Sequence, residues 1–146
     1  MQTPDYTVEG RIRVVVADDF PEMFEAVAKC LTPDCEIADK VADGVALVES
    51  ARKLQPDLLV TDISMPRLNG IEALRQLRSM SLQTPVIVLT INDDEELAKE
   101  AFLAGAQAFV LKSRMGSDLP EAVQEVLAGR TYTSAAIRKR GPNGNN

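Results

Sequence analysis

Four short apolar runs, each followed closely by a polar side chain, restrict the folds that this chain can adopt. The runs occupy residues 14–17, 58–60, 86–89 and 109–111. Each is long enough for a strand buried on both faces of a sheet and too short for a helix. Because segments with helical periodicity separate the runs, we expect parallel strands joined by helices.

The expected strands and helices alternate along the whole chain. Strands are expected at residues 11–17, 35–41, 58–60, 86–90 and 107–111, and helices at about 21–31, 44–54, 71–80, 93–104 and 118–128. Pro120 is expected in the first turn of the last helix, where a missing N–H costs little. The fold class is therefore α/β, with a doubly wound, five-stranded parallel sheet. We expect residues 1–10 to be a flexible leader, 11–130 the folded domain, and 131–146 a basic and then flexible tail.

Polar side chains follow four of the expected strands. They are Asp18 and Asp19, Asp62, Thr90, and Lys112. The carboxyl ends of parallel strands lie along one edge of a sheet, and ligands of open α/β sheets bind at that edge. A threonine or a lysine at one strand end is commonplace, so the prediction depends on all four occurring together. The sequence therefore predicts a site made of three carboxylates, a hydroxyl and an ammonium.

Composition excludes several kinds of chemistry. The 146 residues include no histidine, which rules out a Ser-His-Asp triad, a histidine metal site and a self-supplied phosphohistidine. The net charge of −6 disfavours binding of nucleic acid through this domain. No apolar run approaches the roughly 20 residues of a membrane span, and the first ten residues lack the features of a signal peptide. We therefore expect a cytoplasmic protein with no membrane partner.

The carboxylates predict a metal site. Three crowded carboxylates repel one another and require a cation, and an all-oxygen donor set suits Mg²⁺, with Mn²⁺ as the alternative. We assign Asp19 and Asp62 as direct ligands and Asp18 as a ligand through water. The backbone carbonyl of Ser64 completes the protein's share of the ligands.

The same arrangement suits phosphoryl transfer. A carboxylate held beside a metal, here Asp62, can attack phosphorus and form an aspartyl phosphate. Lys112 would add a second positive charge near the phosphoryl oxygens, and Thr90 would add a hydroxyl donor. Catalysis of such a transfer is mostly positioning and neutralisation of charge.

The residues at these strand ends resemble the motifs of a known family. The acid pair, the segment Asp62-Ile-Ser-Met-Pro-Arg-Leu-Asn-Gly70, Thr90, and Phe109-Val-Leu-Lys112 are together similar to the receiver domain of two-component response regulators, over about residues 11–130. The resemblance implies a flavodoxin-like (βα)5 fold with strand order 2-1-3-4-5. It also implies phosphorylation of Asp62 by a histidine kinase or a histidine phosphotransfer protein, and self-catalysed dephosphorylation. Thr90 and Phe109 would be the switch pair, although plain core packing is an equally good interpretation of Phe109.

The resemblance also bears on partners and activity. The chain is expected to be a signalling phosphoacceptor and not an enzyme beyond its own phosphorylation and dephosphorylation. Lys112-Ser113 and the segment 129–132 are similar to regulators that carry a helix-turn-helix output domain. DNA binding is expected only if such a domain was removed; otherwise the output is a downstream protein, and a homodimer is a further option.

Two other interpretations remain open. A degenerate receiver would dock partners without being phosphorylated, and bulky Ile91, after Thr90, leaves room for this because it can partly cover the site. A haloacid-dehalogenase-like phosphohydrolase also uses a strand-end aspartate. It needs a second aspartate two residues further on, where this chain has Ser64.

Overall fold

The strands and helices alternate along the chain as expected for an α/β protein. The structure is a computed structural model that describes residues 11–135 and 137. Its elements are β1 (Ile12–Ala17), α2 (Glu22–Cys30), β2 (Cys35–Val41), α3 (Gly44–Leu54), β3 (Leu58–Thr61), α4 (Gly70–Ser79), β4 (Val86–Thr90), α5 (Glu95–Leu103), β5 (Ala108–Leu111), the 3₁₀ turn η1 (Lys112–Arg114), α6 (Met115–Leu127) and β6 (Tyr132–Thr133). The α/β class and the flavodoxin-like arrangement are confirmed. The predicted leader and most of the predicted tail lie outside the described residues.

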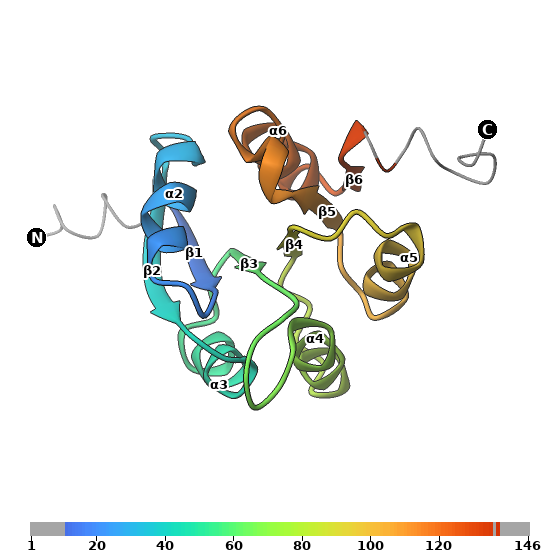
Figure 1. Cartoon of the computed structure of the whole chain (residues 1–146). Coiled ribbons are helices and arrows are strands. Elements are labelled where there is room, and N and C mark those ends of the chain that lie inside the picture. Colours follow the sequence, from blue (N-terminus) through green and yellow to red (C-terminus); the bar gives the residue numbers. More distant parts are fainter. Residues whose placement is uncertain (1–10, 136, 138–146) are drawn as a thin grey trace, which may run out of the picture.

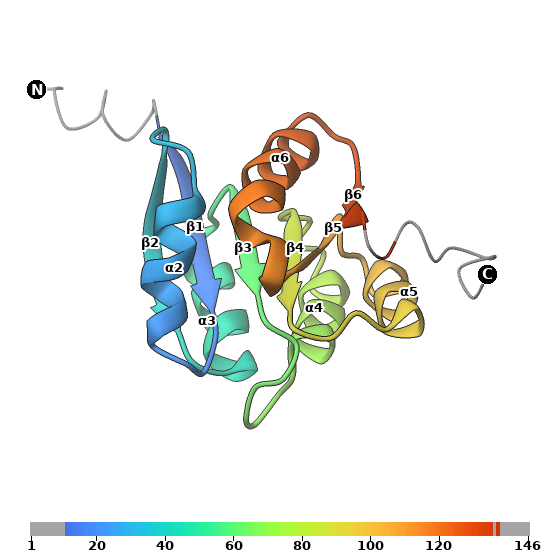
Figure 2. The ribbon, with the colours of Figure 1, turned by 45° about the horizontal axis from the view of Figure 1, so that its top comes forward.

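All strands of the sheet are parallel, in the order β2-β1-β3-β4-β5-β6. The predicted order 2-1-3-4-5 is confirmed, but the prediction of five strands is wrong. The short strand β6 adds to the edge of β5, where the Tyr132 N–H donates to the carbonyl of Gln107 at 3.0 Å. The arrows of β1, β3 and β4 point to the same edge in Figure 2, which is where the site was expected.

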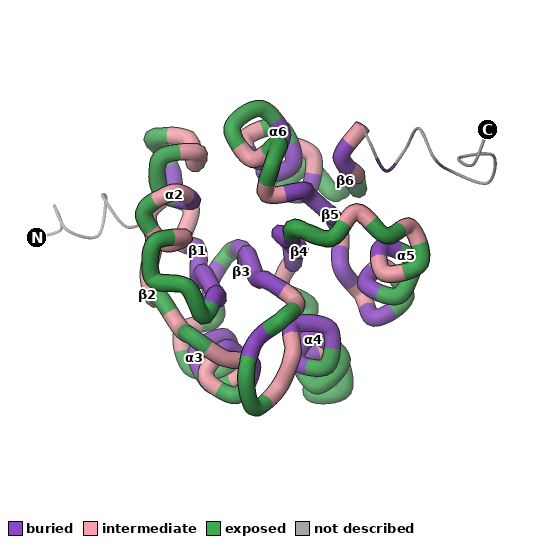
Figure 3. The backbone as a smooth tube through the Cα atoms, in the orientation of Figure 1, coloured by how far each residue is buried: buried purple, intermediate pink, exposed green. Residues whose placement is uncertain are grey.

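Helices cover both faces of the sheet (Figure 1). Val14 and Val16 of β1 face a cluster formed with α2 and α6, whereas Val15 and Ala17 face a cluster formed with α3, α4 and α5. This alternation follows from the two-residue period of a strand. Strands β3, β4 and β5 between these layers are buried, β2 at the edge is mostly half-buried, and the outer sides of the helices are exposed, as Figure 3 shows.

The last helix begins earlier than the sequence suggested. It was expected to start near residue 118, yet η1 runs directly from β5 into α6, which begins at Met115. Pro120 therefore lies inside the helix and not in its first turn. Asp118 does not cap the helix, because its carboxylate is bound by Ser117, Arg114 and Ser134. Within the described ranges, no helix combines the length and the apolar character needed to cross a membrane.

Candidate functional site

The polar side chains predicted at the strand ends meet at one edge of the sheet. Lys112, which follows β5, places its Nζ 2.9 Å from Asp18 Oδ2 and 3.1 Å from Asp62 Oδ2. These residues are 94 and 50 positions from Lys112 in the chain. The three side chains are between 5% and 12% exposed, so water screens their charges poorly.

Three carboxylates lie together around this ammonium. One oxygen from each of Asp18, Asp19 and Asp62 lies within 4.8 Å of the others. The backbone holds two of these groups in place: Asp18 Oδ1 accepts from the N–H of Phe20 at 2.9 Å, and Asp62 Oδ1 accepts from the N–H of Ile63 at 2.7 Å. Asp19 is exposed and faces the solvent side of the cluster.

The electrostatics of the cluster favour a bound cation. Burial raises the pKa of Asp62, the neighbouring charge of Asp18 raises it further, and the Lys112 ammonium only partly opposes them. Burial would lower the pKa of Lys112, but its bonds to the two carboxylates outweigh this effect and raise it. One ammonium is thus shared between two of the three acids, and the cluster keeps an excess of negative charge.

Close backbone packing positions the loop between β3 and α4. A side chain at Gly70 would overlap the carbonyl oxygen of Asp62, and one at Gly44 would overlap that of Leu68. Only glycine permits both approaches, which bring the loop against Asp62 and against the start of α3. The side chain of Asn69 caps α4 by accepting from the N–H of Glu72 at 2.9 Å. The Asn-Gly pair that marks the loop in the sequence is therefore part of the site's support.

Of the two predicted switch residues, Thr90 lies next to the carboxylates and Phe109 lies behind them. Thr90 ends β4, is buried, and accepts from the N–H of Asn92 at 3.1 Å through Oγ1, which keeps the hydroxyl proton available for another acceptor. Phe109 is fully buried in the cluster beneath α4 and α5, opposite Val88 of β4. Phe109 is thus a core residue behind the site in this structure.

An open pocket of about 740 Å³ gives access to the site. Asp19, Asp62, Ser64, Thr90 and Lys112 line it, as the sequence predicted. It also has an apolar rim that the sequence reasoning mostly missed, made of Phe20, Met23, Ile91 and Leu97. Ile91 is 83% exposed and Phe20 is 63% exposed, which is unusual for large apolar side chains. The position of Phe20 directly after the acid pair is the signal that could have revealed this rim.

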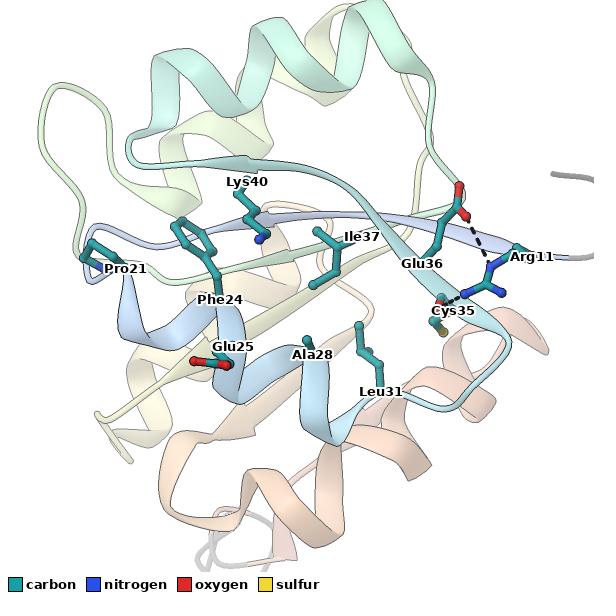
Figure 4. Close-up of a pocket in the computed structure, with 10 residues that line it drawn as sticks. All are labelled: Arg11, Pro21, Phe24, Glu25, Ala28, Leu31, Cys35, Glu36, Ile37 and Lys40. Atoms are coloured by element: carbon teal, nitrogen blue, oxygen red, sulfur yellow. Dashed lines mark hydrogen bonds and ion pairs between the residues drawn. The ribbon is translucent and has the colours of Figure 1, made fainter. Parts of the chain in front are cut away.

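A second hollow lies between α2 and β2 (Figure 4). Its lining includes Phe24, Leu31 and Lys40 but none of the predicted site residues. Arg11 lies 3.2 Å from a carboxylate oxygen of Glu36 and donates to the carbonyl of Cys35 at 3.3 Å. The charge of Arg11 is therefore balanced within the protein.

The residues present fit a magnesium ion. The donor set consists of oxygen atoms only, and three carboxylate oxygens within 4.8 Å of one another are close enough to share one cation. Asp19 and Asp62 line the pocket and Asp18 does not, so Asp19 and Asp62 are the better direct ligands. The pocket lining places Ser64 on the same side as Asp19 and Asp62, consistent with a contribution from its carbonyl.

The fold and this acidic pocket define a class, that of flavodoxin-like receiver domains. The profile of the family described as response regulator receiver domain matches residues 14–124, and the chain belongs to that family.

The chain is similar to several regulators of known name. It is 36% identical over 126 residues to the transcriptional regulatory protein DegU of Brevibacillus brevis, covering 85% of this chain and 53% of DegU. It is 31% identical to the nitrate/nitrite response regulator protein NarL of Escherichia coli K12, covering 85% and 58%. The chain thus spans between half and two thirds of the length of these relatives.

Solved structures agree with this assignment. A LuxR-family two-component response regulator from Aurantimonas sp. SI85-9A1 superposes with a TM-score of 0.83 and 29% identity, over 88% of this chain and 94% of that one. The signal receiver domain of the putative response regulator NarL from Mycobacterium tuberculosis gives 0.78 and 30%, over 82% and 98%. The chain is therefore a receiver domain of the kind found in NarL- and LuxR-type regulators.

Proposed function

We propose that this chain is a phosphoacceptor. Asp62 takes a phosphoryl group from a phosphohistidine, and this modification changes the surface through which the domain binds a partner. The observation that carries the proposal is the contact of Lys112 with both Asp62 and Asp18, beside a pocket that Thr90 also lines. The contact and the shared pocket together supply a nucleophilic carboxylate, an ammonium and a hydroxyl.

The forward step uses these groups, a divalent cation and the donor. An oxygen of Asp62 attacks the phosphorus atom, the P–N bond to the donor imidazole breaks, and the imidazole takes a proton from solvent. Lys112 neutralises charge on the phosphoryl oxygens, and Thr90 donates its hydroxyl proton to one of them. In the return step, water attacks phosphorus, inorganic phosphate leaves and the carboxylate is restored. Because the reaction begins and ends on the protein's own side chain, we propose a signalling role and not an enzymatic one.

Magnesium is the proposed cofactor, with manganese as the alternative. Asp19 and Asp62 would hold it directly, Asp18 through water, and Ser64 through its backbone carbonyl. When bound, the ion neutralises the charge of the carboxylates and of the phosphoryl oxygens. The excess of negative charge around Lys112 supports this assignment.

The proposed switch follows from the position of Thr90. Thr90 and Val88 point to the same face of β4, and Val88 pairs with Phe109 of β5. A phosphoryl group brings about −1.5 to −2 charges and three acceptor oxygens. Movement of Thr90 toward that group would leave volume that Phe109 can fill, which changes the surface beside β5. The result is a shift of population between two packings.

The proposed donors and outputs follow the relatives. The donor would be a histidine kinase or a histidine phosphotransfer protein. DegU is named a transcriptional regulatory protein, and one similar structure is of two RcsB dimers bound to two parallel DNAs. We propose that this receiver controls either a DNA-binding domain in a longer protein or a separate downstream protein, and that it can pair as a homodimer.

Intact mass measurement tests the proposal. The protein is incubated with Mg²⁺ and a small acyl phosphate, and wild type is expected to gain one phosphoryl group that Asp62→Asn does not gain. Asp57→Asn is the matched control, because Asp57 lies just before the other end of β3, where it accepts from the N–H of Arg13 at 2.8 Å. This control should be phosphorylated as wild type is.

The same experiment separates the alternatives. A degenerate receiver would gain no mass with any donor. A haloacid-dehalogenase-like phosphohydrolase would release phosphate from phosphate monoesters in many turnovers. No carboxylate stands at Ser64 to act as its acid, so we expect no such release.

A further inference from the structure

The segment after α6 is bound to β5, the strand that directly precedes Lys112. The N–H of Tyr132 donates to the carbonyl of Gln107, and the N–H of Ser134 donates to the carbonyl of Phe109, both at 3.0 Å. The strand pairing ends at Thr133, so the next N–H of β5, that of Leu111, meets no further strand. It donates instead to the hydroxyl oxygen of Ser134 at 3.0 Å. Ser134 thus completes the edge of β5 one residue before Lys112.

The hydroxyl of Ser134 both accepts and donates a hydrogen bond. While Oγ accepts from Leu111, its proton is donated to Asp118 Oδ2 at 2.8 Å, and Ser134 is completely buried. A buried group that loses such partners pays the cost of desolvation without compensation. The arrangement therefore fixes Ser134, Leu111 and the start of α6 relative to one another.

Asp118 also fixes the part of the chain that follows Lys112. Its carboxylate accepts from Arg114 Nε at 3.3 Å and from the hydroxyl of Ser117 at 3.0 Å. Arg114 belongs to η1, the turn that begins with Lys112. The backbone of Lys112 is thus held from the preceding residue by Ser134 and from the following turn by Asp118.

The segment also touches the layer that contains Phe109. Tyr132 belongs to the apolar cluster under α6, whereas Ile137 is 4% exposed and belongs to the cluster of Phe109 and Leu111. The docking segment, residues 132–135 and 137, therefore lies along the edge of β5 and contributes to both layers, between α6 and α5 (Figures 1 and 2). A change in the packing of Phe109 would alter the site at which this segment docks.

We propose that Ser134, held by Asp118, positions Lys112, and that the docking segment consequently responds to the phosphoryl state of Asp62. Ser134 and Asp118 are positioning residues, since they act through Lys112 and not on the phosphoryl group. Coupling between two sites is reciprocal, so docking of the segment favours phosphorylation and phosphorylation changes the docking. The inference rests on the proposed function and adds the path by which the site reaches the chain beyond the sheet.

Phosphorylation rates test the positioning role. Ser134→Ala should slow the gain of a phosphoryl group from an acyl phosphate by about three- to tenfold, the range that loss of one buried hydrogen bond would give. Ser50→Ala is the matched control, because buried Ser50 also donates to an aspartate, Asp39, at 2.7 Å, in a pair between α3 and β2. The control should lose stability without a change in rate.

A purely structural role for Ser134 predicts a different result in a double-mutant cycle. If Ser134 acts through Lys112, then Ser134→Ala should have no effect on the rate in a Lys112→Ala background. An equal fold-change in both backgrounds would overturn the proposal. So would a wild-type rate in Ser134→Ala, provided that wild type itself is phosphorylated. Absence of phosphorylation in wild type would instead contradict the proposed function.

Hydrogen exchange of the wild-type protein tests the response of the segment without any risk of misfolding. Beryllofluoride, a mimic of the phosphoryl group, should change the exchange rates of the Tyr132 and Ser134 amides by at least about threefold, and should not do so in Asp62→Asn. Binding of the mimic is verified at the Asn92 amide, which is bound to Thr90. A change at Asn92 with none at Tyr132 and Ser134 would overturn the proposal.

Discussion

Replacing Gly70 by alanine is expected to damage the phosphorylation site through the backbone alone. An added Cβ would overlap the carbonyl oxygen of Asp62 and lie 3.1 Å from its carbonyl carbon and 3.2 Å from Cα of Ile63. These are backbone atoms and cannot rotate away, so the junction of β3 and its loop must move by about 1 Å. A shift of about 1 Å in a reacting group costs about 100-fold in rate. The overpacking itself costs about 1–3 kcal/mol of stability.

Gly116→Ala is the matched control for Gly70→Ala. Gly116 also lies near the start of a helix, but nothing lies within 4 Å of an added Cβ there. It should therefore gain about 0.4–1 kcal/mol and be phosphorylated at the wild-type rate. The assay is the initial rate of phosphoryl gain by mass, with stability measured by urea unfolding. A folded Gly70→Ala protein that is phosphorylated as fast as wild type would refute the reasoning.

Three further predictions concern the metal, the pocket rim and pH. Mg²⁺ at about 100 times its dissociation constant should stabilise wild type by about 2.7 kcal/mol in urea unfolding, and Asp19→Asn should lose most of this gain. Ile91→Ala should leave stability within about 0.5 kcal/mol, because Ile91 is 83% exposed, yet shorten the lifetime of the phosphoryl group by opening the pocket to water; equal lifetimes would contradict this. Burial opposes ionisation of Asp118, but hydrogen bonds from Ser134, Ser117 and Arg114 outweigh this effect and lower the pKa of its carboxyl group. The ionised carboxylate therefore stabilises the folded protein above the ordinary carboxyl pKa, and this stabilisation is lost as the pH falls through the pKa of Asp118 in the folded state. Asp118→Asn should therefore cost more stability at about pH 7 than at about pH 3.

The sheet and the placement of the site could be predicted because both depend on local patterns. A run such as residues 86–89 has no way to be buried on both faces except as a central strand, and Thr90 must then emerge at its carboxyl end. Because the strands are parallel, their carboxyl ends lie along one edge of the sheet. Asp18, Asp62 and Lys112 therefore meet although they are far apart in the sequence.

The missed features depend on contacts that no local pattern encodes. A two-residue strand such as β6 has no periodicity, and the aromatic Tyr132 beside β-branched Thr133 was its only signal. The bond between Ser134 and Asp118 joins residues 16 positions apart and has no motif. The start of α6 was misplaced because Pro120 suggested a first turn, whereas the chain entered the helix directly from η1.

Locating the modified residue tests the central claim most directly. An aspartyl phosphate is an acyl phosphate, and borohydride reduces it to the alcohol, which converts the modified aspartate to homoserine. After treatment of wild type with Mg²⁺ and an acyl phosphate, peptide mass spectrometry should find homoserine at position 62, and this product should disappear when the metal is chelated. Homoserine at another aspartate, or none despite a gain of mass, would contradict the account.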